Sequence, residues 1–234
     1  MKAVILAGGK GTRLRPLTYA VPKPLLPLQE KPIIEHIMLH LKEHNVTDII
    51  IALGYLGYQI KNCFHDGKDL GVSIKYQQEK KALGTAGCLY AIKDELKDAP
   101  FLVMGGDNFT NIDITKMLEF HNEKKATVTI ALIEMSIPVD FGVVELNEDC
   151  SIQKFREKPK FDYLGSTMIY CVNPEVLEYI EEGDDFAKDV FPKLIADNKK
   201  IYGYEFKDVW IDIGRIEEYT RANDIAGCIC VKKE

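Results

Sequence analysis

The chain has 234 residues, a mass of 26.5 kDa and a net charge of −6, with 46% hydrophobic and 28% charged residues. This length and ordinary globular composition exclude a disordered chain, and the negative charge argues against a nucleic-acid-binding protein. There is no signal-peptide pattern and no apolar run near the roughly 20 residues of a membrane span, so we expect a cytoplasmic protein that does not act at membranes.

In chain order, strand and helix patterns alternate. Strands are predicted at 2–7, 48–53, 72–77, 101–104, 127–133, 141–146, 152–156, 167–172 and 201–206. Helices are predicted at 32–45, 55–64, 86–96, 113–124, 174–181, 187–197 and 216–226. The runs at 49–53 and 101–104 are continuously apolar, as in strands covered on both faces. We therefore expect an α/β fold with a mostly parallel sheet and a more mixed second half, as one domain over residues 1–234.

The first predicted strand runs directly into glycines and cations. Gly8, Gly9 and Gly11 expose backbone N–H groups that can cradle an anion, and Arg13 and Lys23 follow them. Residues 1–31 carry a charge of +5, so the remainder carries −11. Positive charge concentrated at a glycine loop indicates a small anionic ligand such as a polyphosphate.

Two common phosphate loops do not fit this segment. The chain contains no GxxxxGK[ST] string, which excludes a P-loop. Gly9-Lys10-Gly11 lacks the third glycine of a dinucleotide fingerprint, and no acidic residue appears before Glu30. A dinucleotide-dependent oxidoreductase is therefore nearly excluded.

A third kind of loop matches. The segments Ala7-Gly8-Gly9-x-Gly11-Thr12-Arg13-Leu14 and Pro22-Lys23-Pro24-Leu25-x-Pro27 resemble the opening of the sugar-1-phosphate nucleotidyltransferases. The resemblance continues to residue 226 through further motifs: Leu83-Gly84-Thr85-Ala86-Gly87, Gly105-Gly106-Asp107, Phe141-Gly142-Val143-Val144-Glu145, Phe155-x-Glu157-Lys158-Pro159 and Trp210-Ile211-Asp212-Ile213-Gly214. It implies a Rossmann-like, mostly parallel mixed sheet flanked by helices, and an enzyme that joins a nucleoside triphosphate to a sugar 1-phosphate and releases pyrophosphate.

The resemblance also implies a nucleotide-binding half at residues 1–110. The residues it places at the nucleotide are Leu6, Gly8, Gly9, Gly11, Thr12, Arg13, Glu79, Gly84 and Thr85. Glu79 falls where the family reads the base, and a carboxylate only accepts hydrogen bonds. Guanine offers two adjacent donors on its pairing edge, so Glu79 favours GTP over dTTP or UTP.

The implied catalytic residues are Arg13, Lys23, Asp107 and Lys158. Asp107 follows an apolar strand and two glycines, a position that suits a ligand of Mg²⁺ as well as a turn residue. The family match selects the metal, with Asp212 as the second carboxylate on the same Mg²⁺ ion.

The implied sugar-phosphate-binding half spans residues 111–226, with Gly142, Glu157 and Lys158 at the sugar phosphate. Two departures from the family pattern, Met168 and Arg215-Ile216, leave the sugar open. The first expectation is a mannose-1-phosphate guanylyltransferase. The alternatives are a glucose-1-phosphate thymidylyl- or uridylyltransferase and a non-catalytic regulatory homologue that binds nucleotide sugars, and the resemblance allows a homo-oligomer.

Two other groups of residues, three histidines and two cysteines, have spacings that could bind a metal, but a structural role is the simpler expectation for each. His36, His40 and His44 recur every four residues, but the apolar face of the same helix favours half-buried histidines over a metal site. Cys228 and Cys230 could form a metal clip or redox pair, although reduced thiols are the simpler expectation for all six cysteines.

Overall fold

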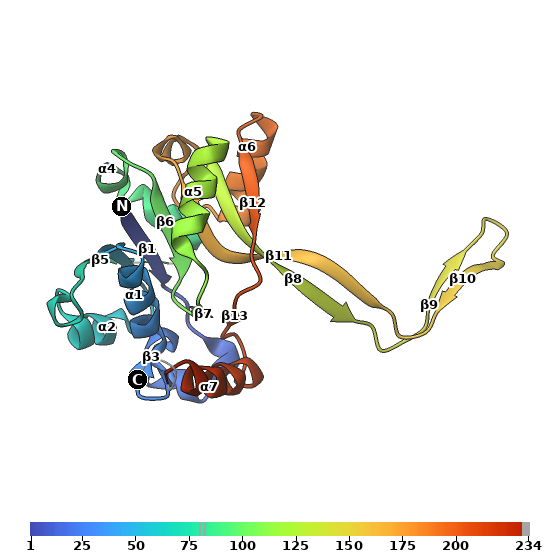
Figure 1. Ribbon diagram of the computed structural model, residues 1–234, viewed down its shortest axis with the longest axis horizontal. Helices are drawn as coiled ribbons and strands as arrows, with labels where there is room; N and C mark the ends of the chain where they lie inside the picture. The colour runs from blue at the N-terminus through green and yellow to red at the C-terminus, as the bar shows by residue number, and fades with distance from the viewer. Residues whose placement is uncertain (80, 82, 231–234) are drawn as a thin grey trace.

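The computed structural model describes residues 1–79, 81 and 83–230 as one seven-stranded sheet with helices on both faces (Figure 1). The strand order is β12-β8-β11-β6-β1-β4-β5. The bounds of these strands are β1 Lys2–Ala7, β4 Asp48–Leu53, β5 Ser73–Gln78, β6 Phe101–Gly105, β8 Val128–Pro138, β11 Lys160–Val172 and β12 Ile201–Glu205. All neighbouring pairs are parallel except those that β11 makes with β6 and β8. The expected mostly parallel mixed sheet is therefore confirmed.

Helices flank the sheet, and each buries apolar side chains against the rest of the protein. Their bounds are α1 Ile33–Glu43, α2 Gly57–Phe64, α3 Gly84–Tyr90, α4 Lys93–Leu96, α5 Ile114–Lys124, α6 Phe191–Ala196 and α7 Ile216–Cys230. The side chains of Cys228 and Cys230 lie outside the described residues. In α1, Ile33, Ile37 and Leu41 recur at helical spacing and are fully or almost fully buried.

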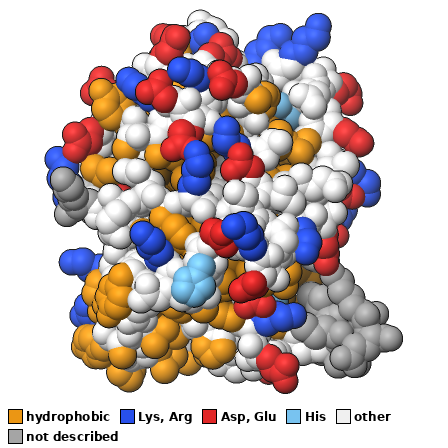
Figure 2. All heavy atoms as spheres, turned by 90° about the vertical axis from the view of Figure 1, so that its left-hand side faces the viewer, with side chains coloured by type: hydrophobic (Ala, Val, Ile, Leu, Met, Phe, Trp, Pro, Cys, Tyr) orange, Lys and Arg blue, Asp and Glu red, His pale blue; other side chains and the backbone are white. Residues whose placement is uncertain are grey.

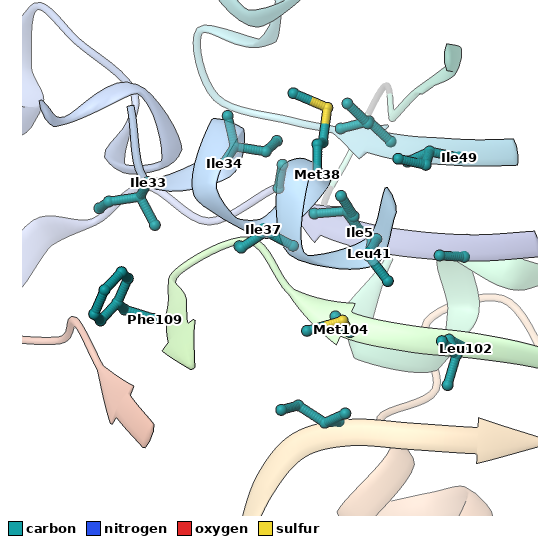
Figure 3. Packing of buried hydrophobic residues seen from close by; sticks show 14 of the residues in the cluster. Ile5, Ile33, Ile34, Ile37, Met38, Leu41, Ile49, Leu102, Met104 and Phe109 are labelled. Carbon is teal, nitrogen blue, oxygen red and sulfur yellow. The ribbon is translucent and has the colours of Figure 1, made fainter. Parts of the chain in front are cut away.

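The largest core lies between α1 and the centre of the sheet. Ile37 and Leu41 of α1 face Ile5 of β1 and Met104 of β6, as Figure 3 shows. A second buried cluster, which includes Val4 and Val103, lies under α3 on the opposite face of the same strands. Burial on both faces explains why β1 and β6 are continuously apolar, and it fixes the positions of the loops that follow them.

Two pairs of very short strands in the described chain lie outside the main sheet. β2 (Pro27–Leu28) pairs with β3 (Lys31–Pro32), and β7 (Asn108–Thr110) pairs with β13 (Trp210–Asp212). The sequence patterns did not predict these strands, because two or three residues are too few to show the alternation of apolar and polar side chains that marks a strand. The β7–β13 pair matters most, since it joins segments about a hundred residues apart.

A long two-stranded ribbon leaves the sheet. β8 and β11 continue to pair from Leu132↔Ser166 out to Pro138↔Lys160, and a second hairpin of β9 (Val143–Leu146) and β10 (Ile152–Arg156) lies at its end. Figure 1 shows this extension pointing away from the rest of the molecule. Residues 132–166 are called the arm, and the other described residues the body. The outer halves of β8 and β11 were not predicted as strands.

The surface of the body is not uniformly charged. On the face that carries α2 and α4, side chains of both signs are interspersed over the upper part, and hydrophobic side chains gather toward the lower end (Figure 2). The body therefore leaves apolar surface open to solvent.

Candidate active site

The glycine loop follows β1 at the carboxyl ends of the parallel strands, where ligands of open α/β sheets bind. It lies close to the ends of both neighbouring strands. Tyr55 N–H, after β4, donates to the Gly8 carbonyl at 3.4 Å, and Gly106 N–H, after β6, donates to the Leu6 carbonyl at 2.9 Å. A Cβ at Gly54 would lie 2.4 Å from the Gly8 carbonyl oxygen, so only glycine permits this approach.

Lys23 is held inside the protein despite its charge. Only 10% of its side chain is exposed, and its Nζ lies 2.6 Å from Asp107 Oδ2 and 3.8 Å from Asp212 Oδ1. Pro22 and Pro24 on either side are also buried, which restricts the backbone that presents the ammonium group. The loop after β1 and the loop after β6 thus meet at one ion pair.

Asp212 reaches the same point through strand pairing. In the β7–β13 ladder Asp212 lies opposite Asn108, and Ile213 N–H donates to the Asp107 carbonyl at 3.1 Å. Burial and the neighbouring Asp107 carboxylate raise the pKa of Asp212, although Lys23 and Arg13 oppose the shift. A further cation beside Asp212 would therefore stabilise the ionised form of this carboxylate.

Arg13 belongs to the same cluster. A Cβ at Gly214 would lie 3.3 Å from both terminal nitrogens of Arg13 and 3.3 Å from Asp212 Oδ2. The guanidinium group and the carboxylate therefore flank Gly214 together, and a side chain there would crowd them. Lys23, Asp107, Asp212 and Arg13 form one site with two cations and two carboxylates.

The two carboxylates fit the Mg²⁺ that the resemblance implies. The ammonium of Lys23 lies against both and takes the position of a cation between them. Within residues 1–79, 81 and 83–230 no group of three or more histidine, cysteine, aspartate or glutamate side chains could hold a metal. Mg²⁺ suits such a site, since it commonly takes one or two carboxylates together with phosphate oxygens and water.

Glu79 lies beside the glycine loop, where a base could be read. A Cβ at Gly8 would lie 3.2 Å from Glu79 Oε2, so this carboxylate faces the loop. Burial raises the pKa of Glu79, and a backbone hydrogen bond from Leu83 offsets part of the shift. Leu6 is half-buried, and Gly9 and Thr12 are exposed.

Gly84 and Thr85 make contacts that sequence reasoning missed. A Cβ at Gly84 would lie 2.3 Å from the Asp184 carbonyl oxygen, and Gly84 has a φ of +75°. Thr85 Oγ1 donates to Asp185 Oδ2 at 2.8 Å and accepts from Phe186 N–H at 2.9 Å. These two residues thus join α3 to the 184–186 segment, and a contact with a base would have to share that role. No spacing in the sequence points to Asp185.

The three expected sugar-phosphate residues lie elsewhere. Gly142, Glu157 and Lys158 are exposed residues beyond the end of the β8–β11 ribbon, where a Cβ at Gly142 would lie 3.2 Å from Glu157 Oε2. The ribbon from Ser166 to Lys160 spans about 20 Å at the usual rise per residue. The chain therefore brings Glu157 and Gly142 together, but not next to Asp107.

The root of the arm is attached to the site by residues that sequence reasoning missed. Asn108 Nδ2 donates to the Thr167 carbonyl at 2.7 Å, and Trp210 Nε1 donates to the same oxygen at 3.2 Å. Thr167 Oγ1 donates to the Ala131 carbonyl at 2.9 Å. Asn108 directly follows Asp107, which is the only sequence signal that could have drawn attention to it.

The three histidines of α1 and Met168 make contacts within the protein. The rings of His36, His40 and His44 make hydrogen bonds to the Leu28 carbonyl, the Ile112 carbonyl and Thr115 Oγ1, as expected of half-buried histidines. Met168 adopts a φ of 57° and packs its side chain against the second core.

Among the described residues there is no helix with the length and hydropathy to cross a bilayer.

An α/β sheet with a cationic glycine loop and two carboxylates at its edge is an arrangement typical of α/β proteins that bind phosphate groups. Comparison with known proteins narrows this class: the family model described as Nucleotidyl transferase matches residues 2–226. The chain belongs to the nucleotidyl transferase family.

Relatives with curated names act on sugar phosphates. The chain is 36% identical to a UTP–glucose-1-phosphate uridylyltransferase of Synechocystis over 95% of its length, and 34% identical to a mannose-1-phosphate guanylyltransferase of Mycobacterium tuberculosis over 94%. It spans 62% and 63% of the length of these two relatives.

Solved structures share the fold over nearly their whole length. A Bacillus anthracis protein provisionally assigned as a glucose-1-phosphate thymidylyltransferase, crystallised with sucrose, is 29% identical, with a TM-score of 0.78 over 97% of this chain and 95% of that one. HddC from Yersinia pseudotuberculosis is 25% identical, with a TM-score of 0.77 over 95% and 98%. These likenesses agree with the expected Rossmann-like fold.

Proposed function

We propose that this chain is a sugar-1-phosphate nucleotidyltransferase, with GTP and mannose 1-phosphate as the favoured pair. One observation carries the proposal: Arg13, Lys23, Asp107 and Asp212 come from three distant segments and meet beside a glycine loop at the edge of the sheet. Two cations and two carboxylates suit a metal-bound triphosphate better than a neutral ligand. Curated relatives named for this chemistry support the assignment.

The chemistry is an in-line displacement. An oxygen of the sugar phosphate attacks the α-phosphorus, the bond between the α- and β-phosphates breaks, and pyrophosphate leaves. No general base is required, because the second pKa of a phosphate monoester is about 6 and the nucleophile is already charged at neutral pH. The protein must hold two anions together and in line, and this is the main barrier.

Each residue of the site has a part in that task. Arg13 would bind the β- and γ-phosphates in a bidentate manner and stabilise the charge on pyrophosphate, and Lys23 would neutralise the phosphates nearest the reaction. Asp107 and Asp212 would hold Mg²⁺, which supplies charge neutralisation at the phosphate oxygens when bound. Lys158 would pair with the sugar phosphate and Glu157 with sugar hydroxyls.

The choice of base rests on Glu79, which faces the glycine loop. Its carboxylate suits the two donors of guanine. A thymidylyl- or uridylyltransferase is the alternative, supported by the uridylyltransferase relative. We place the reaction in the cytoplasm, since Cys63, Cys88, Cys150 and Cys171 are free thiols, as is usual in a reducing compartment.

The test is a matrix of GTP, UTP and dTTP against mannose 1-phosphate and glucose 1-phosphate, with Mg²⁺ and with chelator, read by pyrophosphate release. Release that requires Mg²⁺ and is fastest with GTP and mannose 1-phosphate is expected. Glu79→Gln should then lower kcat/KM for GTP by about tenfold or more, because one acceptor oxygen becomes a donor, with Gln78→Glu as the neighbouring control. A chain that binds the nucleotide sugar without any release would instead be a regulatory homologue.

A further inference from the structure

One side of the arm carries mostly exposed apolar side chains; of these, Phe161 is half-buried under the guanidinium group of Arg156. Residues opposite each other in the ribbon point to the same side, and Met135 pairs with Tyr163 and Ile137 with Phe161. Met135, Ile137 and Tyr163 are 42%, 51% and 57% exposed. The other side of the ribbon carries the polar side chains of Glu134, Ser136, Asp162 and Lys160, together with Pro138 and the exposed Leu164. A strand pair with this alternation is built to lie on another surface.

The hairpin at the end of the arm repeats the pattern. Val144 pairs with Phe155, and both are exposed, as are Leu146, Ile152 and Phe141. An isolated two-stranded ribbon is only marginally stable in water, and a contiguous exposed apolar surface marks an interaction site. The arm therefore requires a partner surface.

The arm also carries residues that the proposed function needs at the body. Lys158 and Glu157 lie about 20 Å beyond the root of the ribbon, at the usual rise per residue. The root is fixed: the Thr167 carbonyl accepts from Asn108 and Trp210, and β12 pairs with β8 up to Leu132. Because the root is pinned beside Asp107 and the ribbon leads outward, the site of one chain lacks its sugar-phosphate residues.

A second copy of this chain offers a surface that fits the arm. Beside the site, Leu17, Tyr19 and Tyr58 are 42%, 61% and 59% exposed, and this rim is tied together by the Tyr55 hydroxyl, which donates to the Tyr19 carbonyl at 3.0 Å. Charges are complementary as well. The arm carries four Lys/Arg and seven Asp/Glu, a net charge of −3, whereas residues 8–23, which follow β1 and include Leu17 and Tyr19 of the rim, carry four Lys/Arg and no Asp or Glu.

We propose that the arm docks on the body of a second copy of this chain and completes that copy's active site with Glu157 and Lys158. The exchange is reciprocal about a two-fold axis, so each site takes its triphosphate residues from one chain and its sugar-phosphate residues from the other. The inference rests on the proposed function for the role of these residues, but the docking itself rests only on the apolar face, the pinned root and the complementary charges.

Subunit complementation tests the shared site. Asp107→Ala, which has little turnover, and Lys158→Ala are co-expressed with different tags and purified as the mixed dimer. The assay uses sugar 1-phosphate well below the raised KM of Lys158→Ala, so that this variant alone also gives little product. One of its two sites then combines an intact body with an intact arm, and about half of the wild-type rate per dimer returns. A mixed dimer of Asp107→Ala and Lys23→Met is the control and stays inactive. A mixed dimer of Asp107→Ala and Lys158→Ala that also stays inactive overturns the shared site.

A measurement of mass tests the docking without any activity. The wild-type chain is expected at twice 26.5 kDa by light scattering. Ile137→Asp on the apolar face shifts it to one chain, whereas Ser136→Asp on the opposite face, one residue away, leaves the dimer intact. Tyr163→Ser repeats the test with a neutral change, and circular dichroism shows that each variant is folded.

The two proposals fail in different ways. A dimeric wild-type chain that responds to Ile137→Asp but releases no pyrophosphate with any substrate pair sinks the proposed function and leaves the docking standing. An active wild-type chain that is monomeric overturns the docking, because its arm must then close over its own body.

Discussion

The body and the arm hold their functional residues in opposite ways. In the body, Lys23 is nearly buried and touches both Asp107 and Asp212, so these side chains are fixed before any substrate binds. In the arm, Glu157 and Lys158 are exposed at the end of a two-stranded ribbon. For the proposed reaction, the contrast predicts that the triphosphate binds to a preformed site, whereas the residues proposed for the sugar phosphate gain their position from a second surface.

Loss of Asp107 should have the largest effect. In Asp107→Ala, turnover is expected to fall by about 10²–10³-fold, because the ion that neutralises the reacting phosphates loses one of two protein ligands. The fold should survive, since Asp107 lies at the edge of the sheet and not in its core. Steady-state pyrophosphate release and a thermal melt measure the two properties.

Asp98→Ala is the matched control for that variant, as it removes an exposed carboxylate at the opposite end of β6. Undiminished turnover in Asp107→Ala would break the assignment of the body as the catalytic part.

Removal of Lys158 should act on one substrate only. Loss of one charge-assisted hydrogen bond to the sugar phosphate is worth about 1.5–3 kcal/mol, so the KM for sugar 1-phosphate is expected to rise by about 10- to 100-fold in Lys158→Ala. The KM for the triphosphate should stay the same, because Lys158 would contact the sugar phosphate, whereas Arg13 and Lys23 would contact the triphosphate. Initial rates with each substrate varied in turn measure this split.

Lys160→Ala, two residues further along the arm, is the control and should change neither constant. Equal rises in both KM values after Lys158→Ala would show that the arm and the body do not divide the substrates between them.

The smallest expected effect concerns the stability of the body. Burial lowers the pKa of His121, whose Nδ1 lies 2.8 Å from Thr129 Oγ1 in the body part of β8. The unfolded chain therefore takes up a proton at higher pH than the folded one. The free energy of unfolding should fall as the pH drops below the ordinary histidine value, near 6.5, toward the lowered value.

His121→Gln should be less stable than the wild type at neutral pH, because it loses ring hydrogen bonds, but its stability should change less between pH 7 and pH 5. Urea unfolding at both pH values gives the slope. A variant with the same slope as the wild type would show that His121 is not the group that titrates.

Much of the body could be predicted from the sequence, because its strands and its glycine loop depend on residues that are close together in the chain. Residues 2–7 and 48–53 form strands within the predicted bounds, since fully buried parallel strands are continuously apolar. The glycine loop after β1 was also recognisable, because an anion cradle requires glycines and cations within a few residues.

The arm was predicted only in part. Glu134-Met135-Ser136-Ile137 alternates as a strand should, but the pattern is short and ends at Pro138, so the strand was expected to stop at residue 133. The short β7 and β13 strands carried no period at all. Pairing between distant segments depends on the whole sheet and leaves no local signal.

The sequence by itself determined the class of fold, the family and the residue types that would bind a polyphosphate, because periodicity and motif spacing are properties of a single segment. Only the tertiary structure decided that Asp107 and Asp212 share one lysine, since β7 and β13 pair across about a hundred residues. It also decided that Lys158 lies far from them, because the direction of a ribbon is set by the hydrogen bonds at its root.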